Sequence, residues 1–282
     1  MRMLTTAAVI VVVAVVALYL FAQYVRRSSM FFPMRYPEGF WNTSALPIQP
    51  EEHWLTTADG VRLHAWLFRA RGHDAPLLVY FHGNGGNLGE RAPIASNLAA
   101  RDISVLLFDW RGYGKSEGTP TESALYKDAI AAHDFARTIT TKIALYGESL
   151  GGPYAAYIAK ESGARCVVIE NSFASLGELG NTLYAPIPLG WAAPYALRTA
   201  HWLNEAGVPV LVMHGKPDEV IAFQLGMSLY KQLRVPKELL ISETAGHCEI
   251  ANVECDRYYD AVTRFIKSGG GQAHSPVLHV KD

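Results

Sequence analysis

Short apolar runs alternate with longer amphipathic segments from about residue 50 to residue 267 of the chain. Buried strands are predicted by the runs that are apolar through their centres, at 76–83, 103–110, 142–147, 166–173, 209–215 and 237–243. Helices are predicted where apolar residues recur every three or four positions, at 88–101, 121–138, 150–162, 222–234 and 254–267. Buried strands that alternate with helices indicate an α/β protein with a parallel sheet covered on both faces.

Two segments depart from this alternation. Residues 51–57 and 61–70 flank Asp59-Gly60 and predict a hairpin with a tight turn. Residues 174–206 lie between two strands, hold three prolines and several aromatic residues, and are longer than an ordinary connection. We expect them to form a short helical cap over the strand ends, and a decorated surface loop is the alternative.

The N-terminal part of the chain has a different composition. Residues 3–25 contain no charged residue, and about 20 apolar residues are enough to span a hydrocarbon core. We therefore expect a single-pass membrane anchor at residues 1–27, with the side of the membrane undecided; a cleaved signal peptide is the alternative. An aromatic and proline-rich connector follows at 28–49, whose aromatics would lie at the membrane interface or fold back onto the domain. The tail at 268–282 is glycine-rich and predicted to be flexible.

Composition and charge exclude several classes of function. The formal net charge is -1 and the chain has no cluster of Lys and Arg, so we expect no nucleic-acid partner. The three cysteines are Cys166, Cys248 and Cys255, and no spacing resembles a zinc site. Cys166 opens an apolar run, and the sequence leaves open whether Cys248 and Cys255 pair.

The junction of the strand at 142–147 with the following helix carries the first candidate for chemistry. It reads Gly147-Glu148-Ser149-Leu150-Gly151. A Gly-x-Ser-x-Gly turn between a strand and a helix holds its serine in a strained conformation with the hydroxyl exposed. Ligands of parallel sheets bind beyond the carboxyl ends of the strands, where Ser149 is placed. We therefore predict Ser149 as a nucleophile.

A serine hydroxyl needs a base and a carboxylate that orients the base. Asp218 follows the strand at 209–215, and His247 follows the next strand, so both are expected at the same edge of the sheet as the serine. Glu219 is an alternative acid, but Asp218 is closer to the strand. Asp109 precedes the serine in the chain and is interpreted as structural.

The loop at residues 81–87, Phe-His-Gly-Asn-Gly-Gly-Asn, ends another strand at this edge. An oxyanion needs two backbone donors, and we predict the N–H groups of Leu150 and Asn84. His82 is expected to brace the loop. A dinucleotide site is not indicated, because Leu88 stands where its fingerprint needs glycine.

These motifs together resemble the α/β-hydrolase superfamily over residues 50–267, and most of all its membrane-anchored abhydrolase-domain serine hydrolases. The resemblance rests on His82-Gly83-Asn84, Asp109-x-Arg-Gly-x-Gly, the turn at Ser149, Asp218 and Gly246-His247. It implies the α/β-hydrolase fold with a mostly parallel eight-stranded sheet, a serine hydrolase mechanism and no cofactor. It also implies an ester or thioester substrate, on a small molecule or on an acylated protein.

Two other functions stay open at this point. A peptidase of the aminopeptidase kind would use the same three residues and would add a carboxylate for the substrate amine, for which Glu178 and Glu205 are candidates. A catalytically silent binding protein is the third possibility, and failure to hydrolyse any activated ester would favour it. The sequence does not give the natural substrate, the acyl length or the oligomeric state.

Overall fold

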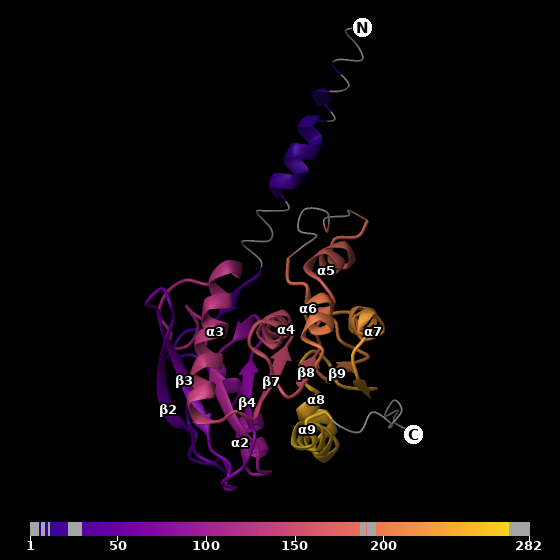
Figure 1. The fold of residues 1–282 in the computed structure, drawn as a ribbon. Coiled ribbons are helices and arrows are strands. Elements are labelled where there is room, and N and C mark those ends of the chain that lie inside the picture. The colour runs from indigo at the N-terminus through magenta and orange to yellow at the C-terminus, as the bar shows by residue number, and fades with distance from the viewer. Residues whose placement is uncertain are drawn as a thin grey trace.

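We describe a computed structural model of the chain. It describes residues 6, 9–10, 12–21, 30–186, 190 and 196–270. Nearly all of these residues belong to one layered α/β unit, from which the N-terminal helical residues project (Figure 1).

The centre of the fold is an eight-stranded sheet in the order β10-β9-β8-β7-β4-β6-β3-β2. Within this sheet, β4, β6, β7, β8, β9 and β10 are parallel to one another, whereas β3 is antiparallel to both β2 and β6. The α/β-hydrolase fold with a mostly parallel sheet of eight strands is thus confirmed. The strands are β2 (Glu51–Thr56), β3 (Arg62–Phe68), β4 (Leu77–Phe81), β6 (Ser104–Phe108), β7 (Ile143–Glu148), β8 (Val167–Glu170), β9 (Val210–Gly215) and β10 (Lys237–Ser242).

Helices cover both faces of this sheet (Figure 1). The helices of this unit are α2 (Ala92–Ala99), α3 (Glu122–Ile139), α4 (Gly151–Ser162), α5 (Leu176–Leu183), α6 (Thr199–Ala206), α7 (Phe223–Gln232), α8 (Ile250–Glu254) and α9 (Asp256–Ser268), with a 3₁₀ helix η1 (Leu88–Arg91) before α2. The predicted helix at 121–138 is α3, and the Thr121 hydroxyl caps it by accepting a hydrogen bond from the Ala124 N–H.

The apolar strands explain the two layers of core. Successive side chains of a strand point to opposite faces, so a strand buried on both faces is apolar at every position. In β4, Leu77, Val79 and Phe81 pack in the core with α3, α4 and α7, whereas Leu78 and Tyr80 pack in the core with α2 and α9. The sheet therefore separates two hydrophobic cores, and the loops at its carboxyl edge are free to carry polar groups.

The segment 174–206 contains α5 and α6. Helix α6 packs against α4, and its residues Ala200 and Leu203 belong to the core on that face of the sheet. Residues 187–189 and 191–195 lie outside the described residues. That this segment caps a site stays a prediction.

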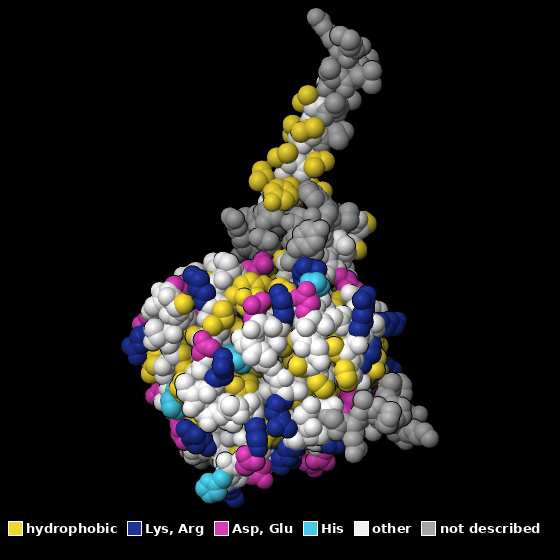
Figure 2. All heavy atoms as spheres, in the orientation of Figure 1, with side chains coloured by type: hydrophobic (Ala, Val, Ile, Leu, Met, Phe, Trp, Pro, Cys, Tyr) yellow, Lys and Arg dark blue, Asp and Glu magenta, His cyan; other side chains and the backbone are white. Residues whose placement is uncertain are grey.

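The prediction of a single-pass membrane anchor at residues 1–27 is wrong. Among the described residues, no helix combines the length and the apolar character needed to cross a membrane. Residues 12–21 are helical and their apolar side chains are largely exposed (Figure 2). The other residues of the predicted anchor lie outside the described part, apart from residues 6 and 9–10.

The connector contacts the sheet domain directly. Its short strand β1 (Phe32–Pro33) pairs in parallel with β5 (Gly85–Gly86), which lies in the predicted oxyanion loop. Phe31 and Trp41 pack against the two hydrophobic cores, as one of the two alternatives requires, while Phe32, Tyr36 and Phe40 stay exposed. The predicted tail from residue 271 onward lies outside the described residues.

Candidate active site

Ser149 lies in the sharp turn between β7 and α4. Its φ angle is 51°, in the left-handed region that a non-glycine residue rarely adopts. The turn is tight because the flanking elements come into backbone contact. A Cβ at Gly151 would overlap the carbonyl oxygen of Phe81, and one at Gly147 would overlap the backbone of Gly152. The two glycines are therefore required by close packing, and the serine hydroxyl is left at the carboxyl edge of the sheet.

Asp218 follows β9 and its carboxylate is surrounded by donors. Oδ1 accepts hydrogen bonds from the backbone N–H groups of Val220 and Ile221 at 2.9 and 2.8 Å. Oδ2 accepts from the Asn171 amide at 2.5 Å and from His247 Nδ1 at 2.8 Å. Burial favours the neutral acid, but hydrogen bonds from His214 and His247 outweigh it and lower the pKa of Asp218 well below its usual range. The carboxylate is ionised at neutral pH.

His247 joins the other two residues. It lies in the loop after β10, and its two ring nitrogens face different partners. Nδ1 is 2.8 Å from Asp218 Oδ2, and Nε2 is 3.0 Å from the Ser149 hydroxyl oxygen. The carboxylate fixes Nδ1 as the protonated nitrogen, which leaves Nε2 able to accept the hydroxyl proton. The structure thus brings together the three side chains that the sequence analysis selected, and the neighbouring Glu219 is exposed.

Asn171 is a member of this site that the sequence analysis missed. It stands directly after β8, with a φ angle of 47°, and its amide reaches the Asp218 carboxylate. The predicted strand at 166–173 included Asn171, whereas β8 ends at Glu170, so a place after a strand, the signal that selected Asp218 and His247, was not visible for Asn171 in the sequence. The sequence does not give the order of strands either, and only that order shows that β8 lies next to β9.

The predicted oxyanion donors are the N–H of Leu150, which follows the serine, and the N–H of Asn84, whose neighbour Gly83 lies against the serine, since a Cβ on Gly83 would lie 3.3 Å from Ser149 Cβ. Neither the Leu150 N–H nor the Asn84 N–H donates a hydrogen bond to another described residue. The Gly83–Asn84 peptide is held at its carbonyl end, where His82 Nδ1 lies 2.8 Å from the Gly83 oxygen. Burial lowers the pKa of His82 to about 4, so the ring is neutral and Nδ1–H donates to that carbonyl. This contact is the bracing role expected for His82.

The connector and a neighbouring loop hold the next peptide of the oxyanion loop. The Asn84 carbonyl accepts hydrogen bonds from the Phe32 N–H at 2.9 Å and from the Tyr113 hydroxyl at 2.7 Å. Asp109, interpreted as structural, accepts from the Leu88 N–H at 2.7 Å and so fixes the end of the same loop. The orientation of the Asn84 N–H is therefore determined from several sides.

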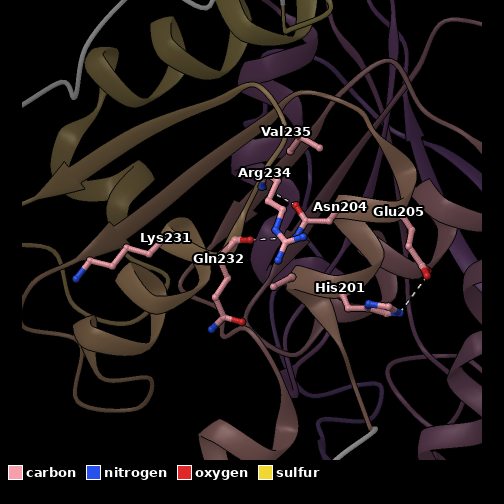
Figure 3. A pocket seen from close by; sticks show the side chains of 8 residues that line it. His201, Asn204, Glu205, Lys231, Gln232, Arg234 and Val235 are labelled. Atoms are coloured by element: carbon pink, nitrogen blue, oxygen red, sulfur yellow. Dashed lines mark hydrogen bonds and ion pairs between the residues drawn. The ribbon is translucent and has the colours of Figure 1, made fainter.

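A cavity elsewhere on the molecule is not this site. It has a volume of about 630 Å³ and lies between α6 and α7, lined by residues such as His201, Glu205 and Arg234 (Figure 3). None of Ser149, Asp218 and His247 lines it. Among its polar side chains, Glu205 pairs with His201 at 3.1 Å.

The described residues contain no group of His, Cys, Asp or Glu arranged to hold a metal ion. All three cysteines are free thiols, so Cys248 and Cys255 do not form a disulfide in this structure.

Comparison with known proteins agrees with this architecture. A family model described as serine aminopeptidase, S33, matches residues 72–173. The uncharacterized protein Rv2307c of Mycobacterium tuberculosis is 30% identical over 267 residues, which cover 92% of this chain and 94% of that protein. Protein bem46 of Schizosaccharomyces pombe is 30% identical over 217 residues, with coverage of 70% and 72%. The esterase Pf2001 of Pyrococcus furiosus superposes with a TM-score of 0.68 at 22% identity, covering 86% of this chain and 98% of that one.

The chain belongs to the α/β-hydrolase superfamily. The chain is similar in sequence to protein bem46 and in fold to the esterase Pf2001.

Proposed function

We propose that the chain is a serine hydrolase that cleaves carboxylic esters or thioesters through an acyl-enzyme intermediate. Ser149 is the nucleophile, His247 the general base and acid, and Asp218 the residue that orients the imidazole. The backbone N–H groups of Leu150 and Asn84 bind the oxyanion. The observation that carries the proposal is the continuous path from Asp218 through His247 to Ser149, with contacts of 2.8 and 3.0 Å.

The geometry supports a two-stage reaction. His247 Nε2 takes the Ser149 proton as the hydroxyl oxygen attacks the acyl carbon, and the carbonyl oxygen becomes negatively charged. The intermediate collapses when the imidazolium donates its proton to the leaving alcohol or thiol. Water then attacks the acyl-enzyme with the same base, and the acid is released. The ionised Asp218 stabilises the imidazolium in both stages.

A small-molecule ester or an acylated protein remains the proposed substrate. The fold likeness to an esterase supports ester chemistry, and the apolar residues of the segment 174–206 favour an acyl chain. A series of p-nitrophenyl esters from acetate to palmitate measures the preferred acyl length. No turnover of any ester in the series would favour a silent binding protein instead.

Serine peptidase activity is the second candidate, and the description of the matching family model favours it. An aminopeptidase also needs a carboxylate for the substrate amine. Both predicted candidates are engaged with neighbours: Glu178 accepts from Gln232, and Glu205 pairs with His201 and Lys160. We therefore expect esters to be cleaved far faster than aminoacyl p-nitroanilides, and the opposite order would favour the peptidase.

Labelling by a fluorophosphonate probe tests the role of Ser149. The wild-type protein should be labelled, and Ser149→Ala should lose both labelling and esterase activity. Ser123→Ala is the matched control, because Ser123 is exposed in the first turn of α3 and should leave labelling intact. Persistent labelling of the Ser149 variant would remove this residue from the proposed role.

A further inference from the structure

Two carboxylates that the reaction does not use lie buried beneath the serine turn. Glu148 ends β7 and Glu170 ends β8, and the two are paired in register across these neighbouring strands. Their side chains are almost fully buried, with residue exposures of 2% and 1%. Burying two carboxyl groups side by side is costly unless each is paired or neutral.

Glu148 is the paired member. Oε1 accepts from Arg91 Nη2 at 2.5 Å and from the Gly83 N–H at 3.3 Å. Oε2 accepts from Arg91 Nε at 3.1 Å and from the Tyr80 hydroxyl at 2.7 Å. Burial raises the pKa of Glu148, but the charge of Arg91 outweighs burial and brings the pKa down to about 2. The group is therefore an ionised acceptor with four donors.

Glu170 is the neutral member. The Tyr146 hydroxyl donates to it, and Tyr146 in turn contacts the Tyr258 hydroxyl at 2.8 Å. Burial raises the pKa of Glu170 to about 8, more than the hydrogen bond from Tyr146 lowers it. Within the described part of the chain, its carboxyl group has no hydrogen bond to the oxyanion loop.

The contacts of Glu148 connect two parts of the proposed site. Glu148 precedes Ser149 in the main chain, and its carboxylate accepts a hydrogen bond from the Gly83 N–H. Gly83 precedes the peptide that carries the Asn84 N–H, and there is little free space here, since a Cβ on Gly83 would lie 3.0 Å from Glu148 Oε1. The side chain thus sets the distance between the nucleophile and the loop opposite it.

Arg91, which follows the loop in the chain, restrains the Glu148 carboxylate. It ends η1, the 3₁₀ helix that follows the oxyanion loop, and it lies against the loop itself, because a Cβ on Gly86 would lie 2.7 Å from Arg91 Nη1. A two-point contact of a guanidinium with a carboxylate fixes orientation as well as distance.

We infer that Glu148 is a positioning residue, whose carboxylate, clamped by Arg91, holds the Gly83–Asn84 peptide where its N–H meets the oxyanion. The inference rests on the proposed serine hydrolase function. A donor fixed in advance is worth most in the transition state, and a misplacement of about 1 Å can cost about 100-fold in rate. Loss of the clamp should therefore lower kcat and leave ground-state binding almost unchanged.

The test compares Glu148→Gln with Glu170→Gln in the full-length chain. Both substitutions keep the volume, but only the first removes a negative charge at pH 7. We expect Glu148→Gln to lower kcat for p-nitrophenyl acetate by about 10- to 100-fold, with KM within about 2-fold. A trifluoromethyl ketone, whose adduct carries an oxyanion, should bind more weakly by a similar factor. Glu170→Gln should keep wild-type values of kcat, KM and inhibitor affinity.

Thermal melting separates positioning from a general loss of stability. A lower melting temperature with an unchanged kcat per folded molecule, or equal effects of the two variants on kcat, would overturn the inference. If Glu148→Gln does not fold, Arg91→Lys takes its place, because lysine keeps the charge but not the two-point contact. It should lower kcat by about 3- to 10-fold at constant KM, and no change in kcat would again contradict us.

The failure of this inference is distinguishable from failure of the proposed function. If the wild-type protein shows Ser149-dependent labelling and turnover but Glu148→Gln keeps full kcat, only the positioning role fails. If the wild-type protein neither reacts with the probe nor cleaves an ester, the proposed function fails, and the role of Glu148 falls with it.

Discussion

Replacement of Asp218 by asparagine should reverse the tautomer of His247. The amide has one acceptor and one donor in place of two acceptors. The donors to the Oδ1 position are the backbone N–H groups of Val220 and Ile221, which are fixed, whereas the Asn171 amide that donates to Oδ2 can flip and present its oxygen, so we expect the new amide oxygen at the Oδ1 position. The amide NH₂ then takes the Oδ2 position and faces His247 Nδ1. To accept this hydrogen bond, Nδ1 must be unprotonated, so the imidazole carries its proton on Nε2. A protonated Nε2 cannot accept the proton of Ser149.

The expected loss follows from this change of tautomer. Where an asparagine enforces the wrong tautomer in a Ser-His-Asp triad, kcat falls about 10⁴-fold, which corresponds to about 5.5 kcal/mol in the activation barrier. The substrate pocket is untouched, so KM should change little. Initial rates with p-nitrophenyl acetate, measured with circular dichroism and a melting curve on the same samples, separate lost catalysis from lost folding.

Glu219→Gln is the matched control, because it changes the adjacent and exposed carboxylate in the same way. It should retain the wild-type rate within about 2-fold, as most exposed substitutions have small effects. A folded Asp218→Asn protein with more than about a tenth of wild-type kcat, or a large loss in Glu219→Gln, would refute the assignment of Asp218 and the tautomer argument with it.

Three further predictions concern stability. Gly151→Ala should destabilise the fold by about 3 kcal/mol or more, because its Cβ overlaps the Phe81 carbonyl, whereas Gly207→Ala, with open space around it and a left-handed φ of 69°, should cost only about 1 kcal/mol; similar urea midpoints would contradict this. The stability of Glu170→Gln relative to the wild type should rise between pH 5 and pH 8, on the order of a few kcal/mol. The wild type loses stability over this range, because a carboxyl whose folded pKa is raised to about 8 stabilises the fold fully only below its unfolded pKa. A difference in unfolding free energy that does not depend on pH would contradict this. Arg111→Ala should cost about 3–5 kcal/mol in urea unfolding, because it leaves the buried Asp128 without its partner at 2.6 Å, and a loss below about 1 kcal/mol would contradict this.

The fold was predictable because its parallel strands are buried on both faces. A strand covered by helices on each side is apolar at every position, so each strand stood out from the amphipathic helices around it. The hairpin at Asp59-Gly60 was predictable from turn chemistry, and Gly60 has the positive φ of 80° that such a turn needs.

The sequence failed at two places, the N-terminal segment and the contact of the connector with the loop at 81–87. The apolar N-terminal segment predicted a membrane anchor, whereas among the described residues no helix is both long and apolar enough to cross a membrane. Likewise, no local pattern showed that Phe32 and Pro33 pair with Gly85 and Gly86. A two-residue strand has no periodicity to recognise.

The order of strands also explains why the site includes a further side chain besides the three that the sequence suggested. Ser149 follows β7 and His247 follows β10, three strands away in the order β10-β9-β8-β7. Neighbouring strands are about 4.8 Å apart, so the loop after β10 must reach back across roughly 14 Å to bring the imidazole to the hydroxyl. Polar groups at the ends of the two intervening strands must lie beneath that crossing. β9 supplies Asp218 and β8 supplies Asn171, which donates to it. A loop that crosses two strands has no backbone hydrogen bonds of a sheet to hold it, so its position depends on these side-chain contacts. Substitutions at Asn171 should therefore affect kcat more than their distance from the acyl carbon suggests.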